Sequence, residues 1–264
     1  MDVPVTISKS FIKQDAWRPL KKFTNARIAI GRTGNAIPLS ENLSFRADHA
    51  LARDAVYTAL NANKLAEEFA ALGMPILLLQ SCANNRGEYL QRPDWGRQLN
   101  EASKNMLLQL GDKMIYDVAV IIADGLSAHA VHQHSRPVLK ELLDLCNNDN
   151  YSIAPLCIVQ QGRVAISDEI GFLLKAKISI ILIGERPGLS SPHSMGVYLT
   201  YQPAIGNTDE RRNCISNIHP QGLNYLNAAK QAFALMQKAM ALKVSGVGLR
   251  GGDDWVIGGR AVDW

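Results

Sequence analysis

The sequence predicts an α/β protein built on an open, mostly parallel sheet, and three observations support this. From about residue 113 onward, short apolar runs alternate with segments of helical periodicity, as in strands joined by crossover helices. Those runs are continuous rather than alternating, which is typical of strands covered on both faces. With 264 residues, 47% of them hydrophobic and 20% charged, the chain can also bury a sizeable core.

The N-terminal part of the chain, residues 26–112, predicts a smaller and mainly helical portion behind an arm. In order, we expect a polar arm (1–25), a short strand or extended entry segment (26–31), an amphipathic helix (45–60), a strand (74–81) and, after a Pro-Asp turn, a helix ended by Gly111. The helix at 45–60 is expected because apolar residues at 47, 50, 51, 55 and 59 follow the i, i+3, i+4 spacing.

Residues 113–249 predict the main α/β domain, which is Rossmann-like because its crossover helices should cover both faces of the sheet. Strands are expected at 117–125, 153–162, 178–188 and 196–203, and helices after Ser127, at 168–176 and from Asn224 to about 243. Ser127 and Asn224 are suitable N-caps, and Pro137 should kink or divide the first helix. Residues 250–264 form a C-terminal tail for which we have no interpretation.

Composition excludes several classes of function. The formal charge of +4 is spread along the chain, so a nucleic-acid partner is not expected. The apolar runs near 118–123 and 178–183 are too short to cross a bilayer, and the N-terminus lacks the apolar core of a secretory signal. The four cysteines form no CxxC pair, which argues against a zinc site and favours reduced thiols. We therefore expect a cytoplasmic protein with no membrane partner.

Three segments stand where strands are expected to end, and ligands of such folds bind outside the carboxyl ends of the strands. These segments are 123–125, 161–164 and 184–188. Glu185 follows a strongly apolar strand, where a carboxylate is costly unless it is paired. It could pair with its neighbour Arg186 or contact a ligand, and both interpretations stay open. Cys214 stands in what reads as a polar loop, where it could line a site or simply fill a local pocket.

Motifs of common enzyme classes are missing. The chain has no GxGxxG at a strand-to-helix turn, no GxxxxGK[ST] and no GxSxG. His129, His132 and His134 make a poor metal cluster, because only the first two share a helix face and no carboxylate is nearby. A free-standing Rossmann-type enzyme that binds a nucleotide or S-adenosylmethionine remains one alternative, although its glycine loop and acidic partner are absent.

Six strings in register give a more specific signal. They are ARIAIGRTG (26–34), YLQRPDWGRQL (89–99), ADGLSA (123–128), QGRVAISDEIG (161–171), IGERPGLSSPHSMGVYLTYQP (183–203) and RRNCISNIHPQG (211–222). Their order and spacing resemble the small subunit of ethanolamine ammonia-lyase from about residue 24 to about residue 249.

This resemblance implies a heteromeric lyase that converts ethanolamine to acetaldehyde and ammonia by radical rearrangement, with adenosylcobalamin as cofactor. It implies a separate large subunit that binds ethanolamine and the adenosyl group, assembled as six large and six small subunits. The small subunit would cover the cobalamin from its other side and would hold no catalytic residue of its own. A non-catalytic scaffold of the same complex is the second alternative.

The same resemblance assigns three cofactor contacts to this chain, namely Val164 of GRV, Glu185 of GERPG and Cys214 of RNCISN. Val164 can offer backbone groups, Glu185 can accept charge-assisted hydrogen bonds from amides, and Cys214 can supply a compact surface. The DxHxxG signature is absent, so no histidine of this chain is expected to bind cobalt. Some relatives carry a long N-terminal extension linked to packaging in a bacterial microcompartment. Fewer than 25 residues precede the shared region here, so encapsulation is not expected.

Overall fold

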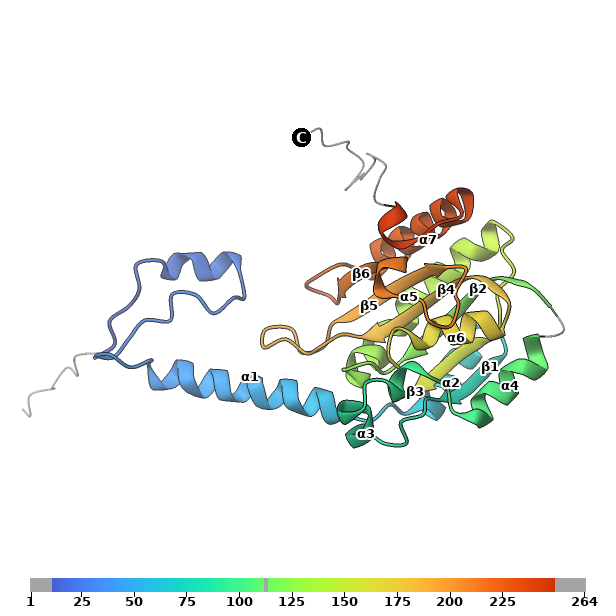
Figure 1. Cartoon of the computed structure of the whole chain (residues 1–264). Coiled ribbons are helices and arrows are strands. Elements are labelled where there is room, and N and C mark those ends of the chain that lie inside the picture. The colour runs from blue at the N-terminus through green and yellow to red at the C-terminus, as the bar shows by residue number, and fades with distance from the viewer. Residues whose placement is uncertain (1–10, 112–113, 250–264) are drawn as a thin grey trace, which may run out of the picture.

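The fold is a six-stranded sheet covered by helices on both faces (Figure 1). A computed structural model describes residues 11–111 and 114–249. The strands are β1 (Ile76–Gln80), β2 (Tyr116–Ala123), β3 (Leu156–Gln160), β4 (Ala176–Gly184), β5 (Met195–Tyr201) and β6 (Arg212–Ile218), in the order β1-β3-β2-β4-β5-β6. The first four in this order are parallel and the last two run antiparallel to their neighbours. The prediction of an α/β protein with a mostly parallel sheet is confirmed.

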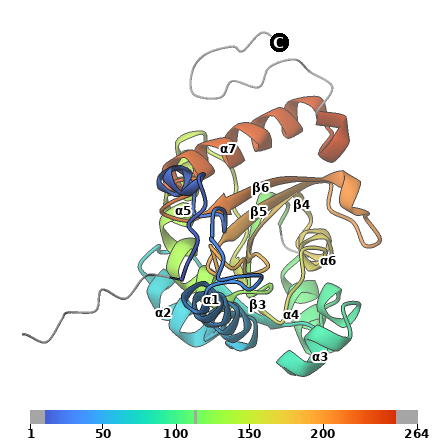
Figure 2. The same cartoon turned by 90° about the vertical axis from the view of Figure 1, so that its left-hand side faces the viewer.

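Helices form a layer on each side of the sheet (Figure 2). They are α1 (Leu39–Tyr57), α2 (Ala62–Ala70), α3 (Arg86–Gln91), α4 (Glu101–Gly111), α5 (Ala128–Asn148), α6 (Ile166–Leu173) and α7 (Tyr225–Leu242), with short 3-10 turns between some of them. One buried cluster joins α2, α5 and α7 to the sheet, and a second joins α4 and α6 to its other face. Because both faces are covered, the central strands β2, β3 and β4 are apolar at nearly every position, as the sequence indicates.

The chain leaves β2 toward β3 through α5 and returns past β2 to β4 through α6, and these helices lie on opposite faces. The direction of winding therefore changes beside β2. The backbone is tightly packed at this point, because a Cβ atom on Gly184 would lie 2.1 Å from the carbonyl oxygen of Ser127. Gly125 has φ +56, and its Cβ would lie 2.2 Å from the carbonyl oxygen of Gly184. Only glycine fits this crossing.

Helix α5 begins as predicted but does not break where it was expected to. The Ser127 side chain accepts a hydrogen bond from the Ala130 N–H, which caps the helix. The helix then continues through Pro137 to Asn148, so the predicted division is wrong. Both halves are held against the sheet by buried side chains before and after the proline, among them Val131 and Leu139. This packing offsets the roughly 3 kcal/mol that an internal proline costs.

Other differences from the prediction concern the N-terminal part and the last strand. Residues 26–31 form no strand, and Ala29 has a left-handed backbone with φ +50; isolated bridges follow at Arg32, Thr33 and Ala36. The helix predicted at 45–60 exists as α1, yet of its predicted apolar stripe only Ala55 is buried. The segment around Cys214 is strand β6 rather than a loop. Figure 1 shows α1 projecting from the α/β body and carrying residues 11–38 at its far end.

No helix in the described ranges is both long and apolar enough to cross a membrane.

Candidate functional site

The carboxyl ends of β2, β3 and β4 meet at one edge of the sheet and place three polar residues there. Asp124 follows β2, Gln161 follows β3 and Glu185 follows β4. These are the three segments that the sequence singles out, and the parallel pairing of β2, β3 and β4 brings them to one edge of the sheet. The polar groups lie beside the point at which the winding reverses, where ligands of such sheets bind.

Asp124 fixes the loop between β3 and α6. Its side chain is fully buried, and its two carboxylate oxygens accept the N–H groups of Gln161 and Gly162, both at 2.9 Å. Arg86 lies 3.7 Å from the same carboxylate. Burial raises the pKa of Asp124 to about 6, against the opposing effect of the Arg86 charge and of the two N–H donors. A buried carboxylate with this many donors holds the start of the loop in place.

Arg86 extends this network away from the strand ends. Its Nε donates to the carbonyl oxygen of Val56 at 2.5 Å, and its Nη1 donates to the Gln161 side chain at 3.3 Å. Its guanidinium also lies 4.4 Å from the ring centre of Tyr89, as does that of Arg163. Burial raises the pKa of Tyr89 to about 12, so the ring is a neutral cation–π partner for both arginines. One buried cluster therefore joins α1, α3 and the β3–α6 loop.

Val164 lies in this loop, half-buried, two residues before α6. Its carbonyl oxygen accepts the N–H of Ser167 at 3.1 Å and the Ser167 hydroxyl at 2.8 Å. The carbonyl is thus used by the first turn of α6. In the described ranges no acceptor is bonded to the Val164 N–H, so of its two backbone groups the N–H is the one that a ligand can use.

Glu185 is half-buried at the end of β4, and its carboxylate faces β5 and β6. It accepts the Ser194 hydroxyl and the N–H of Asn217, the latter at 3.3 and 3.4 Å to its two oxygens. Its own N–H donates to the carbonyl oxygen of Ser194 at 2.9 Å. Among the ion pairs of the described residues none joins Glu185 to Arg186, so the interpretation as a neighbour pair is wrong. The hairpin formed by β5 and β6 supplies the partners instead.

Cys214 lies on β6, directly opposite Tyr198 of β5, and is exposed. In this edge strand Asn213 and Ile215 point inward and Cys214 points outward. The sequence predicted a loop because most residues of the segment are polar, so no alternation of apolar and polar residues is visible. Burial raises the pKa of Tyr198, and the neighbouring Cys214 and Glu185 add to this effect. Tyr198 therefore links the second and third predicted residues. No sequence signal marked it, because it occupies an ordinary strand position.

A small cavity of about 150 Å³ opens between these elements. It is lined by Tyr89, Gly125, Leu126, Arg163, Val164, Ile183, Gly184, Glu185, Arg186 and Tyr198. Two of the three predicted contacts thus line it. Cys214 is not among the lining residues, but it lies opposite Tyr198, which is. Arg163 also lines the cavity, and its buried Nε has no hydrogen-bond partner among the described residues.

The histidines of α5 are separate from this site and from one another. His134 is buried between the hydroxyl of Tyr225, at 3.0 Å, and the carbonyl oxygen of His193, at 2.9 Å. His132 accepts the N–H of Asn61 at 3.1 Å, and the ring of His129 packs on His193. Among residues 11–111 and 114–249, no group of three or more His, Cys, Asp or Glu side chains could hold a metal ion.

Fold and site together define an α/β protein with a small cavity at the carboxyl ends of its parallel strands. Comparison with known families then makes the assignment specific. The model of the ethanolamine ammonia-lyase light chain matches residues 14–250, and the chain belongs to this family.

Named relatives agree with this assignment. The chain is 47% identical over 239 residues to the ethanolamine ammonia-lyase small subunit of Pseudomonas fluorescens, which covers 90% of this chain and 87% of the relative. It is 45% identical over 254 residues to that of Ralstonia nicotianae, covering 94% and 91%. It is 48% identical over 236 residues to that of Pseudomonas putida GB-1, covering 89% and 87%. The name small subunit implies a large-subunit partner.

Proposed function

We propose that this chain is the small subunit of an adenosylcobalamin-dependent ethanolamine ammonia-lyase and forms one wall of the cobalamin site at the interface with a large subunit. One observation carries the proposal. Val164 and Glu185, which are 21 residues apart along the chain, both line one strand-end cavity together with Tyr198, and Tyr198 is the strand partner of Cys214.

The chemistry of this wall fits a corrin, whose rim carries amide arms that need both acceptors and donors. Glu185 is an ionisable acceptor, and the Val164 N–H and the guanidinium of Arg163 are donors. A cavity of about 150 Å³ is smaller than the roughly 300–1,000 Å³ of pockets that enclose a drug-sized ligand. Only the edge of a corrin can be seated here, so a second chain must cover the rest of the cofactor.

The residues of this chain bind and orient. When bound, adenosylcobalamin supplies the radical chemistry that rearranges ethanolamine to acetaldehyde and ammonia. Glu185 would hold one amide arm, and its bonds to Ser194 and Asn217 keep the carboxylate in place. Asp124 and Arg86 keep the Val164 loop in one conformation. This wall would cover the cofactor from the side opposite the adenosyl group, and together with the large subunit it would keep water from the bound cofactor, which protects a radical from side reactions.

The assembly belongs to the same proposal. We expect six large and six small subunits, with ethanolamine bound on the large subunit and with the complex in the cytoplasm. The chain itself supplies no catalytic residue in this account, and its activity depends on the partner.

Two measurements test this function. The purified chain with ethanolamine and adenosylcobalamin should release no ammonia, and adding the large subunit should start the reaction. Cobalamin should be retained more tightly by the two-subunit complex than by the large subunit alone. Ammonia release by the lone chain would contradict the proposal, and equal cobalamin retention would reduce the chain to a scaffold.

A further inference from the structure

Exposed apolar side chains are concentrated in the arm and α1, residues 11–57. Eleven of the twenty-one exposed large apolar side chains of the described ranges lie here. They are Phe11, Ile12, Trp17, Leu20, Phe23, Ile37, Leu39, Leu43, Phe45, Leu51 and Tyr57, with between 41% and 85% of their surface exposed. A soluble protein rarely leaves so much apolar surface uncovered unless another surface binds there.

Helix α1 is also too poorly packed to owe its stability to this chain alone. It has 19 residues and is therefore about 28 Å long, yet Ala55 is its only buried side chain. Ion pairs of Lys21 with Glu41 and of Arg27 with Asp48 fold the arm back onto the helix. Such partly exposed pairs contribute at most about 1 kcal/mol each. Helices normally gain their stability by packing an apolar face, and here that face is open.

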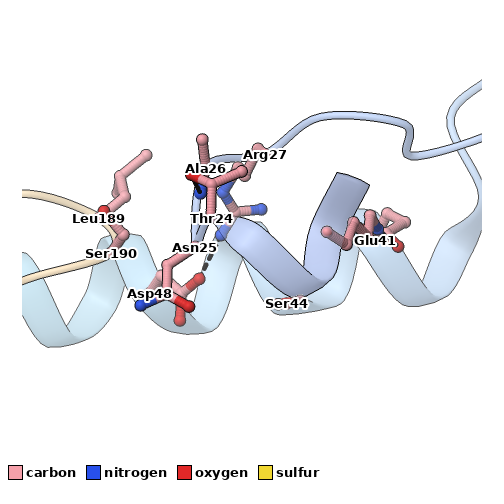
Figure 3. Close-up of a pocket in the computed structure, with 10 residues that line it drawn as sticks. Thr24, Asn25, Ala26, Arg27, Glu41, Ser44, Asp48, Leu189 and Ser190 are labelled. Atoms are coloured by element: carbon pink, nitrogen blue, oxygen red, sulfur yellow. Dashed lines mark hydrogen bonds and ion pairs between the residues drawn. The ribbon is translucent and has the colours of Figure 1, made fainter. Parts of the chain in front are cut away.

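The arm lies on the same side of the molecule as the candidate site. Figure 1 shows α1 and the β4–β5 loop projecting in the same direction from the sheet. A cavity of about 560 Å³ lies between them, and Figure 3 shows Leu189 and Ser190 of this loop on one side and Arg27 and Asp48 on the other. A chain that covers α1 would therefore stand beside the loop that begins with Glu185.

Charge decides between a second copy of this chain and a different partner. Residues 11–57 contain eight Lys or Arg and four Asp or Glu, a formal excess of four positive charges. This equals the formal net charge of the whole chain, so the rest of the chain is balanced. Two such arms would repel each other, whereas an acidic surface would attract one. The arm is thus suited to a different chain.

The available area is sufficient for a stable complex. Five of the exposed side chains are aromatic, and each aromatic side chain can bury about 150–250 Å². Allowing for their exposed fractions, they alone offer roughly 500–800 Å². One side of a standard interface buries about 800 Å², and the six aliphatic side chains add to this area.

We propose that residues 11–57 are the arm through which this chain docks on the large subunit, and that the matching surface is an apolar groove with an acidic rim. The identity of the partner rests on the proposed function. The exposed leucines of α1 are the anchors, and the Lys and Arg side chains of the arm face the rim.

The test replaces anchors without disturbing the helix. Leu43→Gln with Leu51→Gln keeps good helix formers at both positions but removes two side chains that are 53% and 54% exposed. The matched control, Leu226→Gln with Leu242→Gln, makes the same change on α7, where the leucines are 45% and 56% exposed. Sedimentation of the full chain with the large subunit should show a 10- to 100-fold higher Kd for the α1 variant and an unchanged Kd for the α7 control.

Further readouts separate the possible partners. Arg18→Glu with Lys22→Glu should slow association, with the largest effect at low salt. An unchanged Kd for the α1 variant would overturn the proposal. So would a wild-type chain that sediments alone as a dimer and that the α1 variant turns into a monomer. A wild-type complex that assembles through α1 but releases no ammonia would support the docking surface while contradicting the proposed function.

Discussion

Asp124→Asn provides a quantitative test of the network that supports the site. The substitution keeps the size of the side chain and one carbonyl-type acceptor, but it removes the titrating group. It also places an amide donor against one of the N–H groups of Gln161 and Gly162, and it leaves Arg86 without a charged partner. The donor mismatch should destabilise the variant at every pH, by about 1–3 kcal/mol, whereas the charge that faces Arg86 is present in the wild type only above pH about 6.

The pH dependence of the difference isolates the carboxylate. The pKa of Asp124 is raised to about 6 in the folded chain, whereas an unfolded aspartate titrates near about 3.9. The folded state therefore binds the proton more tightly. This contribution to stability is complete below pH about 4 and is lost as the pH rises through about 6. The total is about 3 kcal/mol, of which roughly 2 kcal/mol is lost between pH 4.5 and pH 7.5. Asparagine has no such titration.

The assay is urea unfolding of the full chain at these two pH values, with Asp54→Asn on the exposed surface of α1 as the control. The free-energy difference between wild type and Asp124→Asn should be about 2 kcal/mol larger at pH 4.5 than at pH 7.5. The constant losses cancel in this comparison. A difference that is the same at both pH values would refute the reasoning, because Asp124 would then not be a desolvated carboxylate.

Three further outcomes are expected. Glu185→Gln should weaken cobalamin binding roughly ten- to a hundredfold without impairing subunit assembly. Spectrophotometric titration of the complex would measure this, and an unchanged affinity would remove Glu185 from the site. Cys214 should be alkylated in the empty complex and shielded once cobalamin binds, while the buried cysteines stay unlabelled in both states. Mass spectrometry measures the labelling, and equal labelling of Cys214 with and without cobalamin would contradict its assignment. Gly184→Ala should lower the urea midpoint sharply because its Cβ would meet the carbonyl oxygen of Ser127 at 2.1 Å. Gly188→Ala should not, because its Cβ would meet nothing closer than the carbonyl oxygen of Ser191 at 3.6 Å.

Local pattern was enough to predict the elements that are buried on two faces. The runs that became β2, β3 and β4 are apolar at nearly every position, so burial and sequence carry the same information. Strand β6 was missed because it is an edge strand: it has a neighbouring strand on one side only, and only one of its faces is buried. Its outward positions are polar, and the segment around Cys214 looks like a loop until β5 is beside it.

The partners of the site residues could not be predicted, because they come from distant parts of the chain. Position 185 was correctly marked as an unusual place for a carboxylate, but its partner Asn217 lies 32 residues away and on the strand that was missed. For α1 the predicted helical periodicity was correct, but the expected burial of its apolar stripe was not. An apolar stripe indicates that a helix face will be covered, and it does not indicate whether the same chain or another one covers it.

Arg86 gives a physical reason why the site and the arm occur on one chain. Burying a guanidinium is costly, and its Nη2 atom remains without a hydrogen-bond partner. The same side chain nevertheless bonds to the carbonyl oxygen of Val56 at the end of α1 and to Gln161 at the strand ends, and it lies beside Asp124. An apolar residue of similar volume would fill the space but could not join these segments. The cost of burying Arg86 is therefore offset by the contacts that it makes with both segments. Helix α1, which carries the exposed apolar surface, and the loop that contains Val164 are both fixed to this one side chain. A partner that binds α1 would thus be held in a defined position relative to the candidate site.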